Sequence, residues 1–315
     1  MQKEDTGGIL AEYRAGPDLF RILCWLASAG VVLALGWIVG EIVIAAMPAM
    51  QKFGWDFITN SVWAPNRDRF GVLPFIIGTA LSSFLAILIA FPLGLGIAIF
   101  LTENFLPPGV RNVVRFVVEM LAAIPSVVYG LWGIFVVIPI VKVIGDWAVQ
   151  NFSGLAIVGP TAYGNSLITA SIVLALMILP TLTAISRNAL SSVPGTLREG
   201  AYALGATRWE AILGVILPTA APGVVAATIL SLGRAMGETM AVAMLIGNSS
   251  RLTWSIFEPS GTLAGLLANQ FAEASGLQVS ALMYAALLLV VITLGVNLIG
   301  EAVLRHTQRK TAGIR

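Results

Sequence analysis

The sequence predicts an all-α integral membrane protein with six transmembrane helices. Its 315 residues are 57% hydrophobic and only 11% charged, whereas soluble domains carry about a quarter charged residues. Six apolar runs are each long enough to cross a bilayer, which takes roughly 20 residues of helix. The expected spans cover about 22–47, 72–100, 117–144, 166–189, 219–247 and 278–303.

The basic residues predict the orientation of these spans. With both termini in the cytoplasm, twelve Lys and Arg residues fall on the cytoplasmic side and five on the outer side. Cytoplasmic loops of membrane proteins carry an excess of Lys and Arg, so this distribution favours cytoplasmic termini and an even number of spans. The chain then divides into a cytoplasmic N-terminal segment (1–21), a first transmembrane helix with its external loop (22–71), a transmembrane core (72–304) and a cytoplasmic tail (305–315).

Composition excludes several classes of chemistry. His306 is the only histidine and Cys24 the only cysteine, so neither a zinc site of the HExxH kind nor an intrachain disulfide can form. No lysine completes a GxxxxGK[ST] pattern, so the chain has no P-loop with which to hydrolyse ATP. The net charge of +2 is too small to argue for nucleic acid. We therefore expect no catalytic residue, no metal site and no cofactor bound by this chain.

An intramembrane protease is the enzymatic alternative. A GxSG motif around Ser153 would need glycine where Asn151 stands. A GxGD motif ending at Asp146 would need glycine where Val143 stands. Because neither motif is complete, the sequence argues against a protease.

The segment between the fourth and fifth expected spans is polar and has its own helix start and stop signals. Thr196 with Glu199, and Thr207 with Glu210, each match a capping box, in which a hydroxyl and a carboxylate satisfy each other's backbone donors. Gly205 lies between them, at a C′ position where a left-handed conformation is commonly needed. Two short helices with a sharp corner at Gly205 are therefore expected.

The surroundings of this corner are open to two interpretations. Pro218 is expected to end the second short helix before the fifth span, because proline removes a backbone hydrogen bond. On the first helix, Leu197, Ala201 and Leu204 share one face by helical spacing and form a small apolar surface. The segment is either a well-capped loop lying on the membrane or an element on which another protein docks.

Two charged residues interrupt the fifth apolar run. Arg234 and Glu238 lie four residues apart, so on a helix they can form an ion pair. A charge at bilayer depth costs roughly 2.5–3.5 kcal/mol on insertion scales, so such residues are candidates for a function. Either the pair only neutralises itself within the bundle, or Arg234 meets an anion in transit while Glu238 limits the attraction, so that the anion can leave.

The polar segment resembles the EAA loop of ABC importer permeases. The run EGAYALG at 199–205 is followed, after nine residues, by VILP at 215–218. The residues that match the family's pattern are Glu199, Ala201, Gly205, Leu217 and Pro218. Gly200 and Val215 are mild departures from its alanine and isoleucine. In that family the loop, here 196–218, couples the permease to a separate ATPase subunit, so the resemblance implies this role for the five matching residues.

Other stretches narrow the resemblance to the PstC-type permeases of phosphate-specific ABC importers. The similarity extends from about residue 20 to residue 308. It rests on GRAMGETMAV at 233–242, VEMLAAIPSVVYGLWGIF at 118–135, QKFG at 51–54, WAPN at 63–66 and ANQFAEASGLQVSALM at 268–283. The resemblance implies a type I (MetI-like) permease fold in the bacterial inner membrane, with Arg234 and Glu238 on the substrate pathway.

The resemblance also implies partners. A second, PstA-like permease would complete the pore, a PstB-like ATPase dimer would use ATP and Mg, and a PstS-like protein would deliver phosphate. Sulfate and molybdate permeases share the coupling loop, so a permease for another oxyanion is the alternative. A passive channel or secondary transporter is a further alternative, but such a protein would not need the coupling loop.

Overall fold

The computed structural model describes residues 19–312 apart from 104, 106 and 153. Most of this length is helical, and two short antiparallel strands pair Trp63 with Phe70. The α-helices are α2 (Leu19–Phe53), α3 (Asp56–Thr59), α4 (Leu73–Thr102), α5 (Pro108–Ala123), α6 (Ser126–Trp132), α7 (Ile138–Phe152), α8 (Leu167–Ser191), α9 (Gly195–Ala203), α10 (Arg208–Ala211), α11 (Leu217–Gly237), α12 (Met240–Leu245), α13 (Leu263–Gln270) and α14 (Leu277–Ala312). The shorter elements are β1 (Trp63–Ala64), β2 (Arg69–Phe70), the 3-10 helices η1 (Pro65–Arg67) and η4 (Phe271–Glu273), and the π-helical turns η2 (Gly133–Val137) and η3 (Ile212–Ile216).

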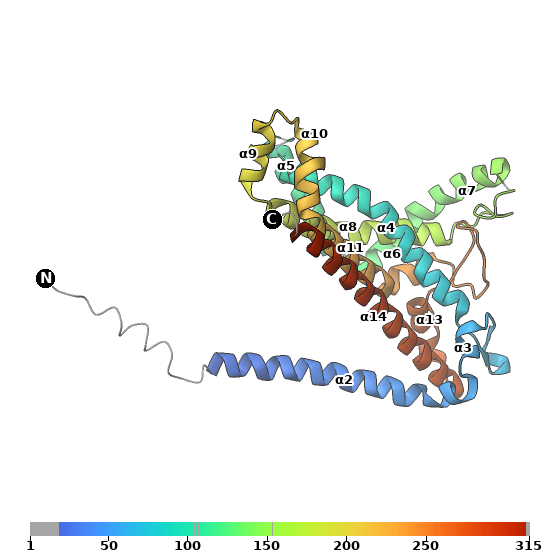
Figure 1. Ribbon diagram of the computed structural model, residues 1–315. Helices are drawn as coiled ribbons and strands as arrows, with labels where there is room; N and C mark the ends of the chain where they lie inside the picture. Colours follow the sequence, from blue (N-terminus) through green and yellow to red (C-terminus); the bar gives the residue numbers. More distant parts are fainter. Residues whose placement is uncertain (1–18, 104, 106, 153, 313–315) are drawn as a thin grey trace.

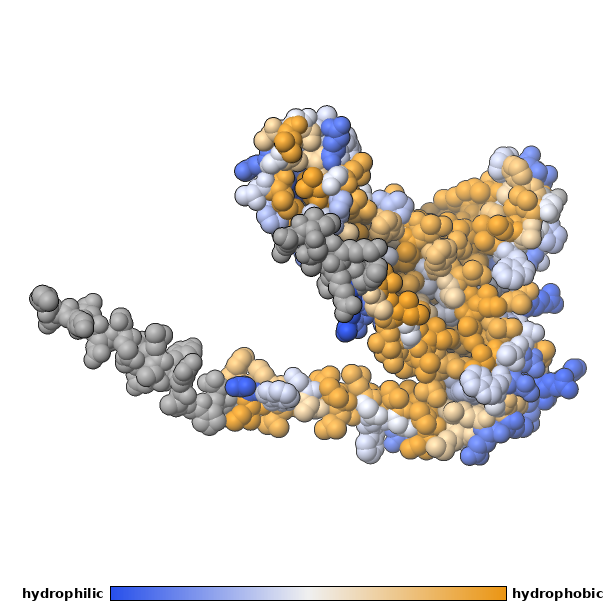
Figure 2. All heavy atoms as spheres, viewed as in Figure 1, coloured by the Kyte–Doolittle hydropathy of each residue, from blue (hydrophilic) through white to orange (hydrophobic). Residues whose placement is uncertain are grey.

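Within the described residues, six helices are long and apolar enough to cross a membrane, which confirms the expected number of spans. They occupy Phe20–Phe53, Leu73–Thr102, Ser126–Phe152, Leu167–Ser191, Arg208–Gly237 and Leu277–Arg305. Apolar side chains cover the middle of the molecule in Figure 2. Hydrophilic ones gather near α3 at one end, and at the other end, over α9 and α10, hydrophilic and apolar ones are mixed.

The third span lies further along the chain than the expected range of 117–144, so the predicted position is wrong. A separate helix, α5, ends at Ala123, and the membrane-length helix begins only at Ser126. Pro125 is the cause, because proline at a helix start loses no intrahelical bond, while inside a helix it would break one. Ile124, the residue before it, is extended with φ −72° and ψ 126°, as steric contact with a following proline favours.

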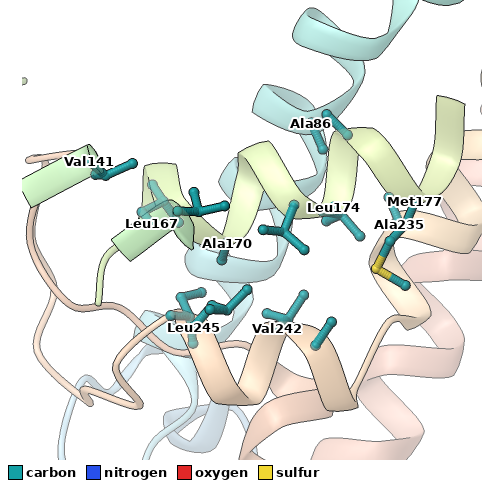
Figure 3. Packing of buried hydrophobic residues seen from close by; sticks show 14 of the residues in the cluster. Ala86, Val141, Leu167, Ala170, Leu174, Met177, Ala235, Val242 and Leu245 are labelled. Atoms are coloured by element: carbon teal, nitrogen blue, oxygen red, sulfur yellow. The ribbon is translucent and has the colours of Figure 1, made fainter. Parts of the chain in front are cut away.

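The central element of the bundle is α8. It packs between α4 and α11, and it also contacts α12 beside the break in the fifth span. Leu174 and Ile178 of α8 are fully buried. In Figure 3, Leu174 lies between Ala86 of α4 and Val242 of α12. A span with most of its surface covered by neighbouring helices is fixed in position, so α8 provides the frame for both candidate sites.

A second, aromatic cluster closes the end of the molecule that carries α3. The rings of Phe57 and Tyr284 stack with centroids 4.4 Å apart, and the Trp63 ring packs edge-on against Phe75. The Trp63 Nε1–H also donates to Oε1 of Gln270 at 2.8 Å. The segment after α2 is therefore a folded cap that joins α3, the hairpin, α13 and α14.

Helix α2 projects away from this cap (Figure 1). It packs along α14 near its C-terminal end, and its most apolar window is entirely unburied. Trp25 and Trp37 are each at least 70% exposed. A helix that is apolar all round and uncovered by its own chain belongs in a membrane.

Candidate functional site

The corner between α9 and α10 forms as the sequence predicts. Gly205 has φ +85°, in the left-handed region, and its N–H donates to the carbonyl oxygen of Tyr202 at 3.0 Å. No atom lies within 4 Å of the place where a Cβ would stand, so glycine is needed here for its backbone conformation and not for space. The predicted Thr207–Glu210 capping box is also confirmed, with the Thr207 N–H 2.7 Å from Oε2 of Glu210.

Two other local predictions for this segment are wrong. Thr196 does not cap α9, because the helix already begins at Gly195 behind Pro194, whose fixed φ sets the turn into the helix. Pro218 does not end the second helix, which runs continuously from Arg208 to Gly237. The π turn η3 lies just before Pro218, and in it the Leu217 N–H donates to the carbonyl oxygen of Ile212. This wider turn shifts the hydrogen-bond register just before the residue that has no N–H.

Three of the five motif residues are exposed and two are covered by neighbouring side chains. Glu199 and Gly205 are exposed on the outer side of the α9–α10 unit. Ala201 is buried, Leu217 is half-buried against the cluster that contains Ile216, and Pro218 is exposed. The motif therefore combines surface residues with residues that fix the unit to the bundle.

The prediction that Leu197, Ala201 and Leu204 form one apolar face on α9 is wrong. Ala201 points inward, whereas Leu204 is 91% exposed because the helix has ended at Ala203. The exposed apolar surface of the unit is instead made by side chains from both short helices and the turn after them. These are Leu197, Tyr202, Leu204, Trp209 and Leu213. Figure 1 places this unit at the far end of the molecule from α3.

Arg198 fastens α9 to two transmembrane helices, and sequence reasoning missed it. Its Nη2 lies 3.2 Å from Oε1 of Glu103, just beyond the end of α4. It also donates from Nη1 to the carbonyl oxygen of Val193 at 2.9 Å and from Nη2 to that of Leu190 at 2.8 Å. The guanidinium thus donates to one carbonyl at the end of α8 and to one just beyond it. Nothing in the sequence indicates a partner so distant along the chain.

A cavity of about 570 Å³ opens beside this ion pair. Glu103 and Arg198 line it, together with Tyr202, Thr207 and Arg208 from the corner. Phe105 stacks against Trp209 at a centroid distance of 5.2 Å. The α9–α10 unit is therefore a supported platform with a polar recess beside it, and its outer residues are uncovered by this chain.

The expected ion pair between Arg234 and Glu238 is wrong. Helix α11 ends at Gly237, and Glu238 is extended with φ −69° and ψ 127°. Arg234 and Glu238 therefore do not lie on successive turns of one helix. The next helix, α12, begins at Met240. Within the described residues neither side chain takes part in an ion pair, and Arg234 hydrogen-bonds through Nη1 to Oγ1 of Thr181 at 3.3 Å.

Arg234 instead borders a pocket between α8, α11 and α14. The cavity is about 400 Å³ and is lined by Thr181, Leu230, Gly233, Arg234, Thr293 and Asn297. A Cβ at Gly233 would lie 2.9 Å from Oδ1 of Asn297, so glycine allows α14 to approach α11 at this level. No carboxylate is among the described residues lining the pocket, so the guanidinium faces hydroxyl and amide groups that do not neutralise it.

The described residues contain no group of three or more His, Cys, Asp and Glu side chains placed to hold a metal ion.

Comparison with known proteins assigns the family. Residues 90–313 match the model of the binding-protein-dependent transport system inner membrane component family. The chain is 41% identical over 303 residues to the phosphate transport system permease protein PstC of Pasteurella multocida, covering 93% of this chain and 92% of that protein. The chain belongs to this family. Its PstC relative in Haemophilus influenzae is 40% identical over 297 residues, covering 92% of this chain and 91% of that one.

A member of the binding-protein-dependent transport inner membrane family is a transporter component and not an enzyme. The matching relatives are named permeases, and with six apolar helices the chain is a multi-pass inner-membrane protein. A structure of a bacterial alginate ABC transporter, in complex with an alginate-bound periplasmic protein, has the same fold, with a TM-score of 0.60 over 91% of this chain and 97% of that one. The sequence identity there is 17%, so the likeness concerns the fold alone. The predicted type I (MetI-like) permease architecture is confirmed.

Proposed function

We propose that this chain is the permease subunit of an ABC importer for inorganic phosphate. The observation that carries the proposal is the 41% identity to the PstC permease of Pasteurella multocida over 303 residues. The chain would form half of the pore, and a PstA-like second permease would form the other half. A PstB-like ATPase dimer would supply the energy with ATP and Mg, and a PstS-like protein would deliver phosphate.

The α9–α10 unit is the surface on which the ATPase docks in this proposal. Its exposed Glu199 and its exposed apolar residues offer charge and area to a partner. Ala201 and Leu217 anchor the unit, and Pro218 follows the π turn that joins it to the fifth span. We assign this end, with both termini, to the cytoplasm because it carries most of the basic residues.

Arg234 meets the anion in transit. The guanidinium has a planar fork of donors that suits phosphate oxygens, and it stays charged at physiological pH. Because no carboxylate of the described chain pairs with it, its charge is available to a ligand. Glu238 lies at the break that follows α11. Its negative charge limits how tightly the anion is held near Arg234, so that the anion can leave.

Transport by the reconstituted complex tests the proposal. The chain, its PstA-like and PstB-like partners and the PstS-like protein are placed in vesicles, and uptake of radiolabelled phosphate is measured with and without ATP. Uptake that requires ATP and the binding protein, and that excess sulfate or molybdate does not reduce, is the expected result. Competition by either oxyanion would favour the alternative substrate, and uptake without ATP would indicate a channel or secondary transporter.

A further inference from the structure

A third cavity lies where α4, α5 and α8 meet, at the end of the bundle that carries α9 and α10. Its volume is about 300 Å³. Its polar lining consists of Arg111, Asn112 and Arg115 from α5, Thr102 from α4, and Arg187 and Ser191 from α8. Three arginines therefore converge on one small space, and no carboxylate is among its described lining residues.

One of the three arginines, Arg187, has no ion-pair or hydrogen-bond partner within the described residues. Arg115 pairs with Glu119 one turn further along α5, at 2.7 Å, but this pair is more than half exposed. Arg187 is half-buried, and within the described residues it makes no hydrogen bond or ion pair. A half-buried guanidinium without an acceptor lacks partners for up to five donors, so the cavity favours an oxyanion.

Helix α5 shows where that oxyanion comes from. Besides its two arginines it carries an apolar stripe whose members recur every three or four residues and are each at least 49% exposed. The stripe consists of Val113, Phe116, Val117 and Met120. A helix with basic residues beside an exposed apolar stripe lies at the boundary between lipid headgroups and acyl chains. The cavity thus opens at headgroup depth, with an apolar surface beside it for the attached chains.

We propose that this cavity binds the phosphate group of an anionic lipid. Arg187 would grip the phosphate oxygens from α8, and Arg111 and Arg115 on α5 would add positive charge beside it. Basic pockets between transmembrane helices are suited to lipid headgroups in this way. The bound lipid would join α5 to α4 and α8, the two helices whose ends carry Glu103 and the start of the α9–α10 unit. The proposal concerns lipid, so it does not rest on the transport function.

The amount of anionic lipid that the purified transporter retains tests this proposal. The complete transporter is placed in nanodiscs of phosphatidylcholine with a minority of phosphatidylglycerol, extracted into mild detergent, and its bound lipids are counted by native mass spectrometry. We expect phosphatidylglycerol to be enriched on the wild-type protein. Each basic residue near a membrane surface contributes about 1 kcal/mol, so R187Q should weaken retention roughly fivefold, and R187Q with R115Q roughly 25-fold.

Two control variants separate this site from general charge and from misfolding. R69Q removes an exposed arginine of strand β2, which does not line the cavity, and should leave retention unchanged. R187K keeps the charge without the fork and should retain an intermediate amount of lipid. Equal enrichment in wild type and R187Q, or an equal loss in R69Q, would overturn the site.

Free phosphate is distinguished in a second arm. The wild-type complex and R187Q are placed in nanodiscs of phosphatidylcholine alone, and equilibrium binding of radiolabelled inorganic phosphate is measured. If the cavity is a lipid site, the two proteins bind equal amounts of phosphate. If wild type binds an additional phosphate that R187Q lacks, and shows no phosphatidylglycerol enrichment in the first arm, the lipid assignment is wrong.

Discussion

The Arg198 guanidinium lies 3.2 Å from the Glu103 carboxylate, and it joins segments that are 95 residues apart in the chain. Their side chains are only 22% and 11% exposed. The same guanidinium holds two carbonyl oxygens at the end of α8. One side chain therefore fixes the position of α9 relative to both α4 and α8, and any force that a partner exerts on α9 passes first to these two helices.

Removing Arg198 should destabilise the protein more than an ordinary surface change would. R198Q removes the ion-pair partner of Glu103 and the charged donor to two carbonyl oxygens, at a cost of about 3 kcal/mol or more. We expect a lower unfolding temperature for the purified complex, measured by intrinsic tryptophan fluorescence. R305Q breaks the exposed Arg305–Glu301 pair and is the matched control, since exposed pairs contribute little. Equal unfolding temperatures in R198Q and R305Q would contradict the anchoring role.

The local features of this segment could be predicted from sequence, and the long-range ones could not. Gly205 and the Thr207–Glu210 box depend on residues within one or two turns of each other, so their spacing is sufficient. The Arg198–Glu103 pair and the contact of Trp63 with Gln270 depend on how distant helices pack. No spacing rule specifies such contacts.

Hydropathy also misplaced two features of the membrane region. The residues on both sides of Pro125 are apolar, so hydropathy does not reveal the boundary between α5 and the third span. The fifth run is apolar on both sides of Glu238 and has no proline there, so it predicted a continuous helix and an ion pair. Helix breaks inside apolar segments are tolerated where neighbouring helices or a cavity satisfy the backbone, and sequence periodicity does not detect this.

The corner at Gly205 should be required for coupling and not for folding. A β-branched residue at φ +85° is strained, so G205V should displace α10 relative to α9. The open space around this position means that the substitution creates no clash. We expect G205V to insert and to co-purify with its partner permease, but to lose ATP-driven phosphate uptake. G195A, which changes a glycine with no such φ, should transport normally, and normal uptake in G205V would refute the coupling role.

Cysteine labelling tests the orientation. In a Cys24→Ser background, single cysteines replace Asn66, Ser275 and Ala203, all of which are exposed. An impermeant maleimide added to intact cells should label the first two positions, since they lie at the end opposite α9. The cysteine at 203 should react only after the membrane is permeabilised. Labelling of 203 from outside would reverse the proposed topology.

Without an ion pair to Glu238, Arg234 should not be required for assembly of the transporter. If Glu238 neutralised Arg234, losing either charge would strand the other, and both single variants would assemble poorly. Because Arg234 lies in α11 and Glu238 lies in the break that follows it, we expect R234Q and E238Q each to assemble normally, scored by co-purification of the ATPase.

Transport should then separate these variants. R234Q loses the charged donors that replace the hydration of phosphate, and hydrogen bonds to charged groups contribute about 1.5–3 kcal/mol, so uptake should fall roughly tenfold or more. R234K keeps the charge without the fork and should be intermediate. Thr181→Val removes the oxygen to which Arg234 donates while keeping the side-chain shape, so it should reduce uptake less than R234Q does. A well-assembled R234Q/E238Q variant with full uptake of radiolabelled phosphate would show that Arg234 takes no part in the pathway.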